Sequence, residues 1–305
     1  MVNPGAKIGD DFYDAMLQHI AGRFVALPDK PEETPETTLH ALWHFAAGEP
    51  QSVEGAMQRA LPGLNASDTD ALRRAVDRRL SGVPLAHITG RQRFLGIDFF
   101  AGPDALVPRK ETEILGRLAL SHMAKLSAER GKLRIADICT GSGNLAVSLA
   151  LHEPRCTIEA TDISVPALRL AHLNAAHHGV ADRVTLRDGD LFGGFAGQGF
   201  EGTFDLIVAN PPYISSGKLK AMASEIAEHE PSLAFDGGGF GLSIVGRLIK
   251  EAPTYLKSRS WLCFEVGAGQ GPHMKTSLER VGAYGAIETA SNDAGQIRVL
   301  AAQTR

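Results

Sequence analysis

Short apolar segments alternate with helical segments from Leu133 onward, and no other feature of the sequence restricts the fold as strongly. Short apolar strands separated by helices are typical of parallel βαβ units. We therefore predict an α/β domain whose mostly parallel sheet has helices on both faces. The expected strands are 133–138, 156–161, 183–187, 204–209 and 261–266, with two weaker strands near 283–289 and 296–302. The expected helices are 144–151, 165–178, 243–255 and 271–281.

The N-terminal part of the chain, up to Leu80, follows a helical pattern instead. Apolar spacing predicts helices within 1–27 and at 38–46, 52–61 and 67–80, the last with Ser67 as N-cap and the first two separated by a proline-rich break at 28–37. Apolar residues around Gly96, followed by a Gly102-Pro103-Asp104 turn, predict a short β-hairpin, after which a helix is expected from about 111 to 129. We thus expect a small helical domain at 1–88, a β-hairpin connector at 89–110 and the α/β domain at 111–305.

Charge and hydropathy exclude several classes of protein. The 305 residues carry 31 basic and 35 acidic side chains, a net charge of −4, and the deficit lies in the segment 1–80 with 8 basic and 12 acidic side chains. A protein that holds duplex nucleic acid by its phosphates is expected to have a basic surplus, so direct nucleic-acid binding is not favoured. No window approaches about 18 consecutive apolar residues, and the N-terminus lacks a signal-peptide pattern. We expect a cytoplasmic monomer that does not bind membranes.

Metal and disulfide chemistry are not expected either. Cys139, Cys156 and Cys263 are odd in number and far apart, so we interpret them as buried thiols. His40 and His44 share one helix face but lack a third ligand, and we expect them to line a domain surface. A basic helix face is typical of a solvated surface, with contact to an acidic or RNA-bearing partner as the alternative; it comprises Arg73, Arg74, Arg78 and Arg79.

A glycine-containing loop follows the first strand of the α/β domain. Its sequence is Asp137-Ile-Cys-Thr-Gly-Ser-Gly-Asn144, in which two glycines permit a sharp turn and leave room for a ligand. It lacks the third glycine of a dinucleotide fingerprint and the Lys-Ser/Thr pair of a triphosphate loop. A nucleotide-like cofactor without a pyrophosphate is the functional interpretation, and a plain tight turn is the alternative.

Two aspartates follow the next strands. Asp162 ends the second strand, downstream of Gly143, where a carboxylate can accept hydrogen bonds from both ribose hydroxyls of a cofactor. Asp190 follows the third strand and is a candidate partner for an adenine exocyclic amine, or alternatively a turn aspartate in a glycine-rich loop. The loop and Asp162 together favour a nucleoside-binding site.

The fourth strand runs directly into Asn210-Pro-Pro-Tyr213, the most specific motif of the chain. The two prolines fix both φ angles and make this corner rigid. An amino group attached to a planar system is a poor nucleophile, but the Asn210 side-chain oxygen and the Pro211 carbonyl can accept its two hydrogens and aim its nitrogen at an electrophilic methyl group, while Tyr213 packs on its planar face. An Asn-Pro turn after a buried strand is the structural alternative.

Several segments together resemble the HemK/PrmC family of S-adenosylmethionine-dependent methyltransferases, which modify a glutamine side-chain amide in peptide chain release factors. The resemblance covers about residues 76 to 300. It rests on the junction stretch 78–90, the Pro108-Arg-Lys-Glu-Thr-Glu113 signature, the Asn210-Pro-Pro-Tyr213 motif, the segments Glu230 to Gly238 and Gly241-Leu242, and Phe264 to Gln270. Lys110, Cys139 and Leu191 depart from the usual family residues, and the segment 1–75 shows no family sequence.

The resemblance implies a Rossmann-like class I methyltransferase sheet and assigns roles to individual residues. Asp162 would hold the ribose, and Asp190 and Leu191 would lie near the adenine of S-adenosyl-L-methionine, which leaves as S-adenosyl-L-homocysteine. Asn210 would receive the glutamine beside this cofactor, and the helical domain 1–88 would contact the protein substrate. The cofactor loop would be Cys139, Thr140, Gly141, Ser142 and Gly143, and the catalytic motif Asn210, Pro211, Pro212 and Tyr213.

Three hypotheses about function remain at this point. The first is methyl transfer to the side-chain amide nitrogen of a glutamine in a protein, with a release factor as the expected partner. The second is a nucleic-acid amino methyltransferase that uses the same motif on an extruded or unpaired adenine or guanine. The third is a cofactor-binding partner protein without catalysis.

Overall fold

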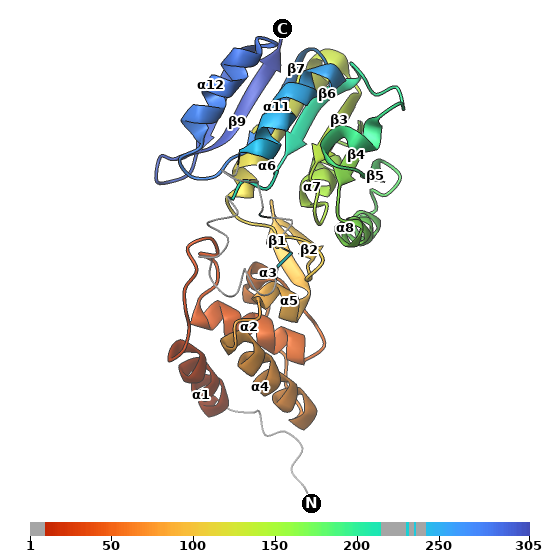
Figure 1. Cartoon of the computed structure of the whole chain (residues 1–305). Helices are drawn as coiled ribbons and strands as arrows, with labels where there is room; N and C mark the ends of the chain where they lie inside the picture. The colour runs from red at the N-terminus through yellow and green to blue at the C-terminus, as the bar shows by residue number, and fades with distance from the viewer. Residues whose placement is uncertain (1–9, 215–229, 232–234, 236–241) are drawn as a thin grey trace, which may run out of the picture. The chain divides into compact units, whose positions relative to one another are not determined.

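The computed structural model describes residues 10–214, 230–231, 235 and 242–305, which form two compact units (Figure 1). The first unit ends at Pro103, so it includes the hairpin that the sequence suggested as a connector, and the second begins at Asp104. No helix within the described ranges is both long and apolar enough to cross a lipid bilayer. Each unit has its own buried apolar core.

A seven-stranded sheet forms the centre of the second unit within the described residues. Its strands are β3 (Leu133–Ile138), β4 (Cys156–Asp162), β5 (Val184–Asp188), β6 (Phe204–Ala209), β7 (Leu256–Glu265), β8 (Tyr284–Ser291) and β9 (Ile297–Thr304). The order is β5-β4-β3-β6-β7-β9-β8. Neighbours from β5 to β7 are parallel, and β9 is antiparallel to β7 and β8. The prediction of a mostly parallel sheet is confirmed.

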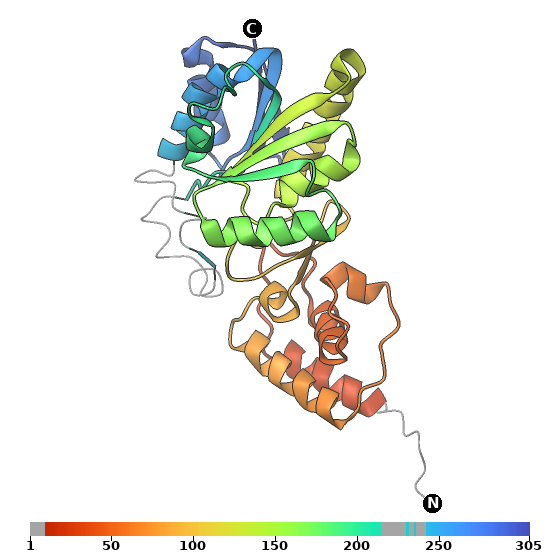
Figure 2. The same cartoon turned by 90° about the vertical axis from the view of Figure 1, so that its right-hand side faces the viewer.

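Helices cover both faces of this sheet, as the sequence predicted (Figures 1 and 2). They are α6 (Thr112–Arg130), α7 (Asn144–His152), α8 (Val165–His177), α11 (Ser243–Tyr255) and α12 (Gly271–Val281), with a short 3₁₀ helix η1 (Leu191–Phe195) after β5. Apolar residues of α11 and α12 pack with Ile207 and Phe264 in one core cluster. Every residue of β6 is buried, which is expected of a central strand with both faces covered.

The strand order predicts a crevice at the carboxyl ends of the central strands. From β3 the chain passes to β4 and β5 on one side and then returns to β6 on the other side of β3. Ligands of open α/β sheets bind outside the carboxyl ends of the strands at such a reversal. The loop after β3 and the motif after β6 therefore meet where a ligand site is expected.

One strand of the second unit begins earlier than predicted. The sequence placed its start at residue 261, but β7 begins at Leu256. Lys257, Ser258 and Arg259 are polar, so their pattern gave no strand signal, and the pairing register with β6 shifts across this stretch. Lys257 and Arg130 instead form ion pairs with the buried Asp205, at 2.8 and 2.9 Å.

The first unit packs five helices and one hairpin among the described residues. Its elements are α1 (Asp10–Ala21), α2 (Pro35–Ala46), α3 (Val53–Met57), α4 (Ala66–Leu80), α5 (Leu85–Thr89), β1 (Arg91–Phe94) and β2 (Ile97–Phe100). The strands β1 and β2 are antiparallel and turn at Leu95 and Gly96, both with positive φ, so the turn at Gly102 lies outside the hairpin. Leu39, Leu42 and Leu72 are fully buried in its core.

Several predicted helix bounds in this unit were wrong. The helix predicted at 38–46 begins at Pro35, because Thr34 caps it and proline is favourable in the first turn. The N-cap of α4 is Asn65 and not Ser67, since the Asn65 and Asp68 side chains each accept a hydrogen bond from the other's backbone N–H. The helix predicted at 52–61 ends at Met57, and α5 was not predicted.

Two predicted surface positions are buried instead. His44 is 1% exposed and lies within α2 among core residues, so the prediction that it lines a surface is wrong. Arg79 is 7% exposed and its Nη2 donates to Glu33 Oε2 at 2.9 Å, so it does not belong to the solvated basic face. Both errors arise because helical spacing predicts which residues share a face of a helix. It does not predict which other parts of the chain cover that face.

Candidate active site

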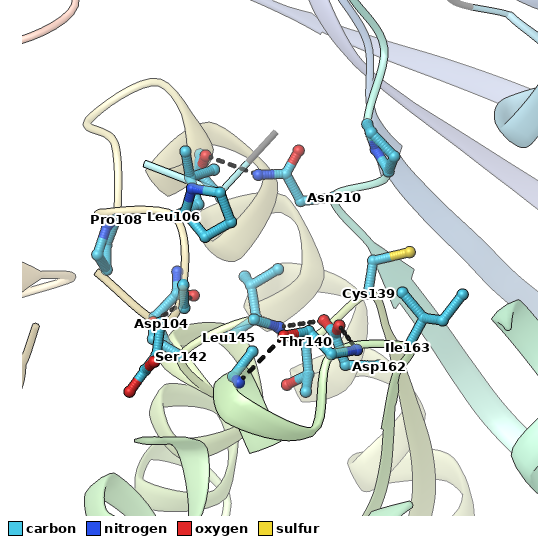
Figure 3. Close-up of a pocket in the computed structure, with 18 of the residues that line it drawn as sticks. Asp104, Leu106, Pro108, Cys139, Thr140, Ser142, Leu145, Asp162, Ile163 and Asn210 are labelled. Carbon is cyan, nitrogen blue, oxygen red and sulfur yellow. Dashed lines mark hydrogen bonds between the residues drawn. The ribbon is translucent and has the colours of Figure 1, made fainter. Parts of the chain in front are cut away.

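A pocket with an empty volume of about 1100 Å³, including its open mouth, lies at the carboxyl ends of β3, β4 and β6 (Figure 3). Residues from within 104–112, 139–145, 162–167 and 189–191 line it. The predicted site residues in its lining are Cys139, Thr140, Gly141, Ser142, Asp162, Asp190, Leu191, Asn210 and Pro212. The other three, Gly143, Pro211 and Tyr213, are not part of the lining.

The loop after β3 is held by a buried carboxylate that the sequence did not single out. The Thr140 hydroxyl and the Ala146 backbone N–H both donate to Asp137 Oδ2, at 2.6 and 3.0 Å. Gly143 has a φ of 78°, and a Cβ there would lie 3.0 Å from the Cβ of Ala171, so its role is close packing of the loop against α8. Cys139 adopts a φ of 60° and lines the pocket.

Burial raises the pKa of Asp137 to about 7, although its hydrogen bonds from Thr140 and Ala146 work in the opposite direction. Between about pH 4 and pH 7, Asp137 therefore keeps its proton in the folded protein. In the unfolded chain, where its pKa has the ordinary value of 3.8, Asp137 has released this proton. The contribution of this group to stability is present below about pH 4 and is lost as pH rises through about 7.

We expect Asp137→Asn to flatten the fall of unfolding free energy between about pH 4 and pH 7, by up to about 1.4 kcal/mol per pH unit. Denaturant unfolding at a series of pH values measures this slope. The exposed Asp182→Asn in the same unit is the matched control and should keep the wild-type slope. Equal slopes for wild type and Asp137→Asn would contradict the prediction.

Asp162 lies in the wall of the pocket and is held by the backbone around it. Its Oδ2 accepts a hydrogen bond from the Gly141 N–H and its Oδ1 from the Ser164 N–H, both at 2.8 Å. Burial is the main cause that raises the pKa of this carboxyl, and the backbone hydrogen bonds oppose it. A carboxylate so fixed at a strand end can accept hydrogen bonds from vicinal hydroxyls of a ligand.

Asp190 and Leu191 form the wall next to β5. Asp190 Oδ2 accepts a hydrogen bond from Arg247 Nη1 at 2.8 Å, so this aspartate already has a charged partner on α11. Leu191 is buried with a φ of 51°, and the Thr161 hydroxyl donates to its carbonyl at 2.8 Å. This hydrogen bond fixes the turn into η1 and keeps an apolar side chain in the pocket lining.

The Asn210 side chain reaches the pocket at the end of β6 (Figure 3). Its Nδ2 donates to Thr112 Oγ1 at 3.3 Å. This contact engages the nitrogen of the amide and leaves the oxygen for a ligand. Pro211 is buried and Pro212 is half-buried in the pocket lining.

Tyr213 is held on the other side of the corner. Its hydroxyl donates to Glu265 Oε1 at 2.9 Å, and its backbone carbonyl accepts from Gln270 Nε2 at 2.9 Å. Burial and the neighbouring Glu265 raise the pKa of the phenol well above its ordinary value. Because the ring is absent from the pocket lining, its contact with the acceptor amide stays a prediction.

Glu230 holds a second loop at the pocket mouth. The Val107 N–H donates to Glu230 Oε2 at 2.9 Å, and Arg109 forms an ion pair with the other carboxylate oxygen. This fixes the segment from Asp104 to Arg109, much of which lines the pocket. Of the motif segments at 230–238 and 241–242, the structure describes Glu230, Pro231, Phe235 and Leu242. The other residues of these segments lie outside the described residues.

Thr112, Glu265 and Arg298 were not predicted as site residues, although they surround the Asn210-Tyr213 corner. Glu265 could have been found by the rule that found Asp162, since it is an acidic residue at the carboxyl end of a parallel strand. Thr112 lies inside the Pro108 to Glu113 signature. Arg298 lies in the antiparallel strand β9, and nothing in the local pattern marks it.

Comparison with known proteins places this geometry in context. The family model described as "Methyltransferase small domain" matches residues 109–258. The release factor glutamine methyltransferase of Moorella thermoacetica is 38% identical over 76% of this chain and 78% of its own length. The ribosomal protein uL3 glutamine methyltransferase of Bradyrhizobium diazoefficiens is 37% identical, over 61% of this chain and 58% of its own length.

Among solved structures, the hMettl16 catalytic domain superposes with a TM-score of 0.52, covering 75% of this chain and 81% of that chain. Its sequence identity to this chain is 14%. At that identity the likeness supports the fold alone.

Proposed function

Because the chain belongs to the release factor glutamine methyltransferase family, we propose that it transfers a methyl group from S-adenosylmethionine to the side-chain amide nitrogen of a glutamine in a peptide chain release factor. It is a methyltransferase by family, and glutamine is the acceptor residue of its relatives. The position of Asn210 in the pocket lining, with its amide nitrogen engaged by Thr112, is the observation that carries the proposal.

The pocket lining fits an adenosine-bearing cofactor. Asp162 offers a carboxylate for two ribose hydroxyls, and the Gly141 turn leaves space beside it. Leu191 and Ile163 offer apolar surfaces for a flat base, and Ile163 is 57% exposed although it is a large apolar residue. When bound, S-adenosylmethionine supplies an electrophilic methyl group on a positively charged sulfur.

The residues of the corner make the acceptor amide reactive by positioning it. The Asn210 side-chain oxygen and the Pro211 carbonyl accept the two amide hydrogens, which fixes the nitrogen and favours the positive charge that develops on it. Asp162 and the loop after β3 would hold S-adenosylmethionine, which would supply its methyl group to this nitrogen and keep the electron pair of the broken carbon–sulfur bond on its sulfur. The methylated amide then loses one proton to water.

The release factor is the acceptor we favour over a ribosomal protein. The release factor glutamine methyltransferase of Moorella thermoacetica is matched over 78% of its length. The ribosomal protein uL3 glutamine methyltransferase of Bradyrhizobium diazoefficiens is matched over 58% of its length. We propose that the helical domain at 1–88 recognises the release factor and that the enzyme acts in the cytoplasm, where translation terminates. The exposed side chains of Arg73, Arg74 and Arg78 belong to that domain.

Methyl-labelled S-adenosylmethionine and three purified acceptors test the proposal. A release factor, ribosomal protein uL3 and total cellular RNA are incubated separately with the full chain and then treated with nuclease or protease. We expect label in the release factor that survives nuclease and is released by protease. Label in uL3 alone would change the partner but keep glutamine methylation. Label that only nuclease removes would overturn the proposal in favour of a nucleic-acid amine.

A further inference from the structure

The motif segment from Phe264 to Gln270 ends in a side chain that joins two neighbouring loops. Gln270 Nε2 donates to the Tyr213 carbonyl at 2.9 Å, and Gln270 Oε1 accepts a hydrogen bond from the Gly267 N–H at 2.8 Å. A carbonyl only accepts and a backbone N–H only donates, so both partners require the same orientation of the Gln270 amide. This amide bridge connects the loop after β7 to the last residue of the Asn210-Tyr213 corner.

The bridge acts where strand pairing has ended. The strands β6 and β7 are paired as far as Ala209 and Phe264. The two prolines of the corner have no N–H and cannot extend the ladder of backbone hydrogen bonds. In the described part of the chain, Tyr213 is joined to the loop after β7 by side-chain hydrogen bonds, and the one from Gln270 is the one that holds its backbone.

The same point is where the stiffness of the two prolines ends. Each proline fixes its own φ angle and keeps the residue before it out of the helical region, so the backbone is restricted up to the φ angle of Pro212. The ψ angle of Pro212 and both backbone angles of Tyr213 lie beyond this restriction. The Tyr213 carbonyl is anchored there by Gln270, and the Ile214 N–H donates to the Phe235 carbonyl at 2.9 Å.

Gly267 lets the Tyr213 ring lie close to the bridge. It is buried, and a Cβ added there would lie 3.0 Å from Tyr213 Cδ2 and 3.0 Å from Gln270 Oε1. Both distances are shorter than an ordinary van der Waals contact, so a larger residue would push the ring or the amide away. The Gln270 N–H donates to the Gly267 carbonyl at 3.0 Å and closes this turn. The turn therefore contacts both the ring and the carbonyl of Tyr213.

The stability of the following helix does not explain a glutamine at this position. Gln270 is the N-cap of α12, where serine, threonine, aspartate and asparagine are preferred because their side chains bond to the first turn. The Gln270 side chain makes no such capping hydrogen bond. Its amide is directed to Tyr213 and Gly267 instead, which indicates a role outside α12.

We propose that Gln270 is a positioning residue, which holds the end of the corner so that the Tyr213 ring packs on the planar face of the acceptor amide. The inference rests on the proposed methyl transfer and on that predicted packing. Without the bridge, the Tyr213 hydroxyl keeps its hydrogen bond to Glu265, but the Tyr213 backbone is free to rotate and the ring tilts. A small displacement of a group that positions a substrate slows the chemical step.

The first test separates the two hydrogen bonds of Gln270. Gln270→Glu keeps an oxygen for the Gly267 N–H but loses the donor to the Tyr213 carbonyl, whereas Gln270→Met has a similar length and loses both. With a release factor as acceptor, we expect each variant to lower kcat about 10- to 100-fold, with the Kd of S-adenosylhomocysteine near wild type.

The matched control is Gln303→Met. Gln303 also donates from Nε2 to a backbone carbonyl, that of Arg259 at 3.2 Å, and lies outside the pocket lining. This variant should keep the wild-type kcat. A Gln270→Glu variant as fast as wild type would overturn the proposal.

A double-variant cycle tests whether Gln270 acts through the Tyr213 ring. If it does, adding Gln270→Met to Tyr213→Ala should slow the reaction by less than about twofold, whereas the losses of independent roles would multiply. Gln270→Glu replaces Gln270→Met if that variant does not fold. Losses that multiply in the double variant would overturn the proposal.

Nuclear magnetic resonance gives a readout that does not depend on activity. The chain has four tyrosines, so carbon-13 labelling of the tyrosine carbonyls gives four signals, and Tyr213→Phe identifies the one that belongs to Tyr213. We expect Gln270→Glu and Gln270→Met to shift the Tyr213 signal and to leave the other three in place. An unchanged Tyr213 signal would overturn the proposed bridge.

Wild-type activity on the glutamine acceptor is measured first. Its absence would count against the proposed function itself. A normal wild-type rate that both Gln270 variants keep would count against the positioning role alone.

Discussion

Replacing Asn210 by alanine is expected to lower kcat about 10²- to 10³-fold, the cost typical of losing one preorganised polar group that acts on the transition state. The Asn210 side chain would supply one of the two oxygens that accept the hydrogens of the acceptor amide. Its removal leaves the amide nitrogen free to keep its lone pair in the π system and to rotate away from the methyl group. Single-turnover methylation of a release factor measures the chemical step directly.

The same variant should bind S-adenosylhomocysteine almost as tightly as wild type. The loop after β3 and Asp162 are expected to hold the cofactor. Among the described residues, neither of them forms a hydrogen bond with the Asn210 side chain. Calorimetric titration with S-adenosylhomocysteine is therefore the control for intact folding. Full activity of Asn210→Ala would contradict the positioning mechanism, and a matching loss of cofactor affinity would show that Asn210 acts in binding instead.

Replacing Asp162 by alanine is expected to have its main effect on the cofactor. A hydrogen bond to a charged group contributes about 1.5 to 3 kcal/mol, so loss of this carboxylate should raise the Kd of S-adenosylhomocysteine at least about 10-fold. Asp162→Asn keeps one acceptor oxygen and should lose less affinity than alanine. Isothermal titration calorimetry of both variants gives the comparison, and wild-type affinity in Asp162→Ala would contradict the ribose-binding role.

The raised pKa of Asp162 adds a pH dependence to the same experiment. A ribose hydroxyl donates to the ionised carboxylate, so affinity should fall as pH drops through a pKa that lies above the usual aspartate value. Asp162→Asn has no such carboxylate and should lack this part of the pH dependence. Equal pH profiles in wild type and Asp162→Asn would assign the effect to another group.

The elements that surround the site could be predicted closely from the sequence. The bounds of β3, β6, α11 and α12 agree with their predicted ranges, because each has a continuous apolar or helical pattern with a clear end. The bounds that were missed depend on hydrogen bonds or pairing that a pattern does not display. Asn65 caps α4 through a reciprocal contact with Asp68. In β7 the polar residues after Leu256 lie where the pairing register with β6 shifts, and Lys257 forms an ion pair with Asp205.

The candidate site was predictable where its residues follow strands directly. Asp162 and Asn210 stand at the ends of β4 and β6, and the topology brings both into one pocket. The contact from Thr112 to Asn210 spans 98 positions, and that from Tyr213 to Glu265 spans 52. Such contacts depend on how α6, β7 and β9 pack around the corner, which no local pattern reports.

Tandem mass spectrometry of a release factor after reaction with the full chain and S-adenosylmethionine tests the central claim most directly. We predict a single added methyl group on the side-chain nitrogen of one glutamine, formed by wild type and scarcely by Asn210→Ala. A methyl group on a lysine, an arginine or a backbone nitrogen would contradict the account, because the Asn210 and Pro211 oxygens are proposed to accept the two hydrogens of a planar NH₂ group.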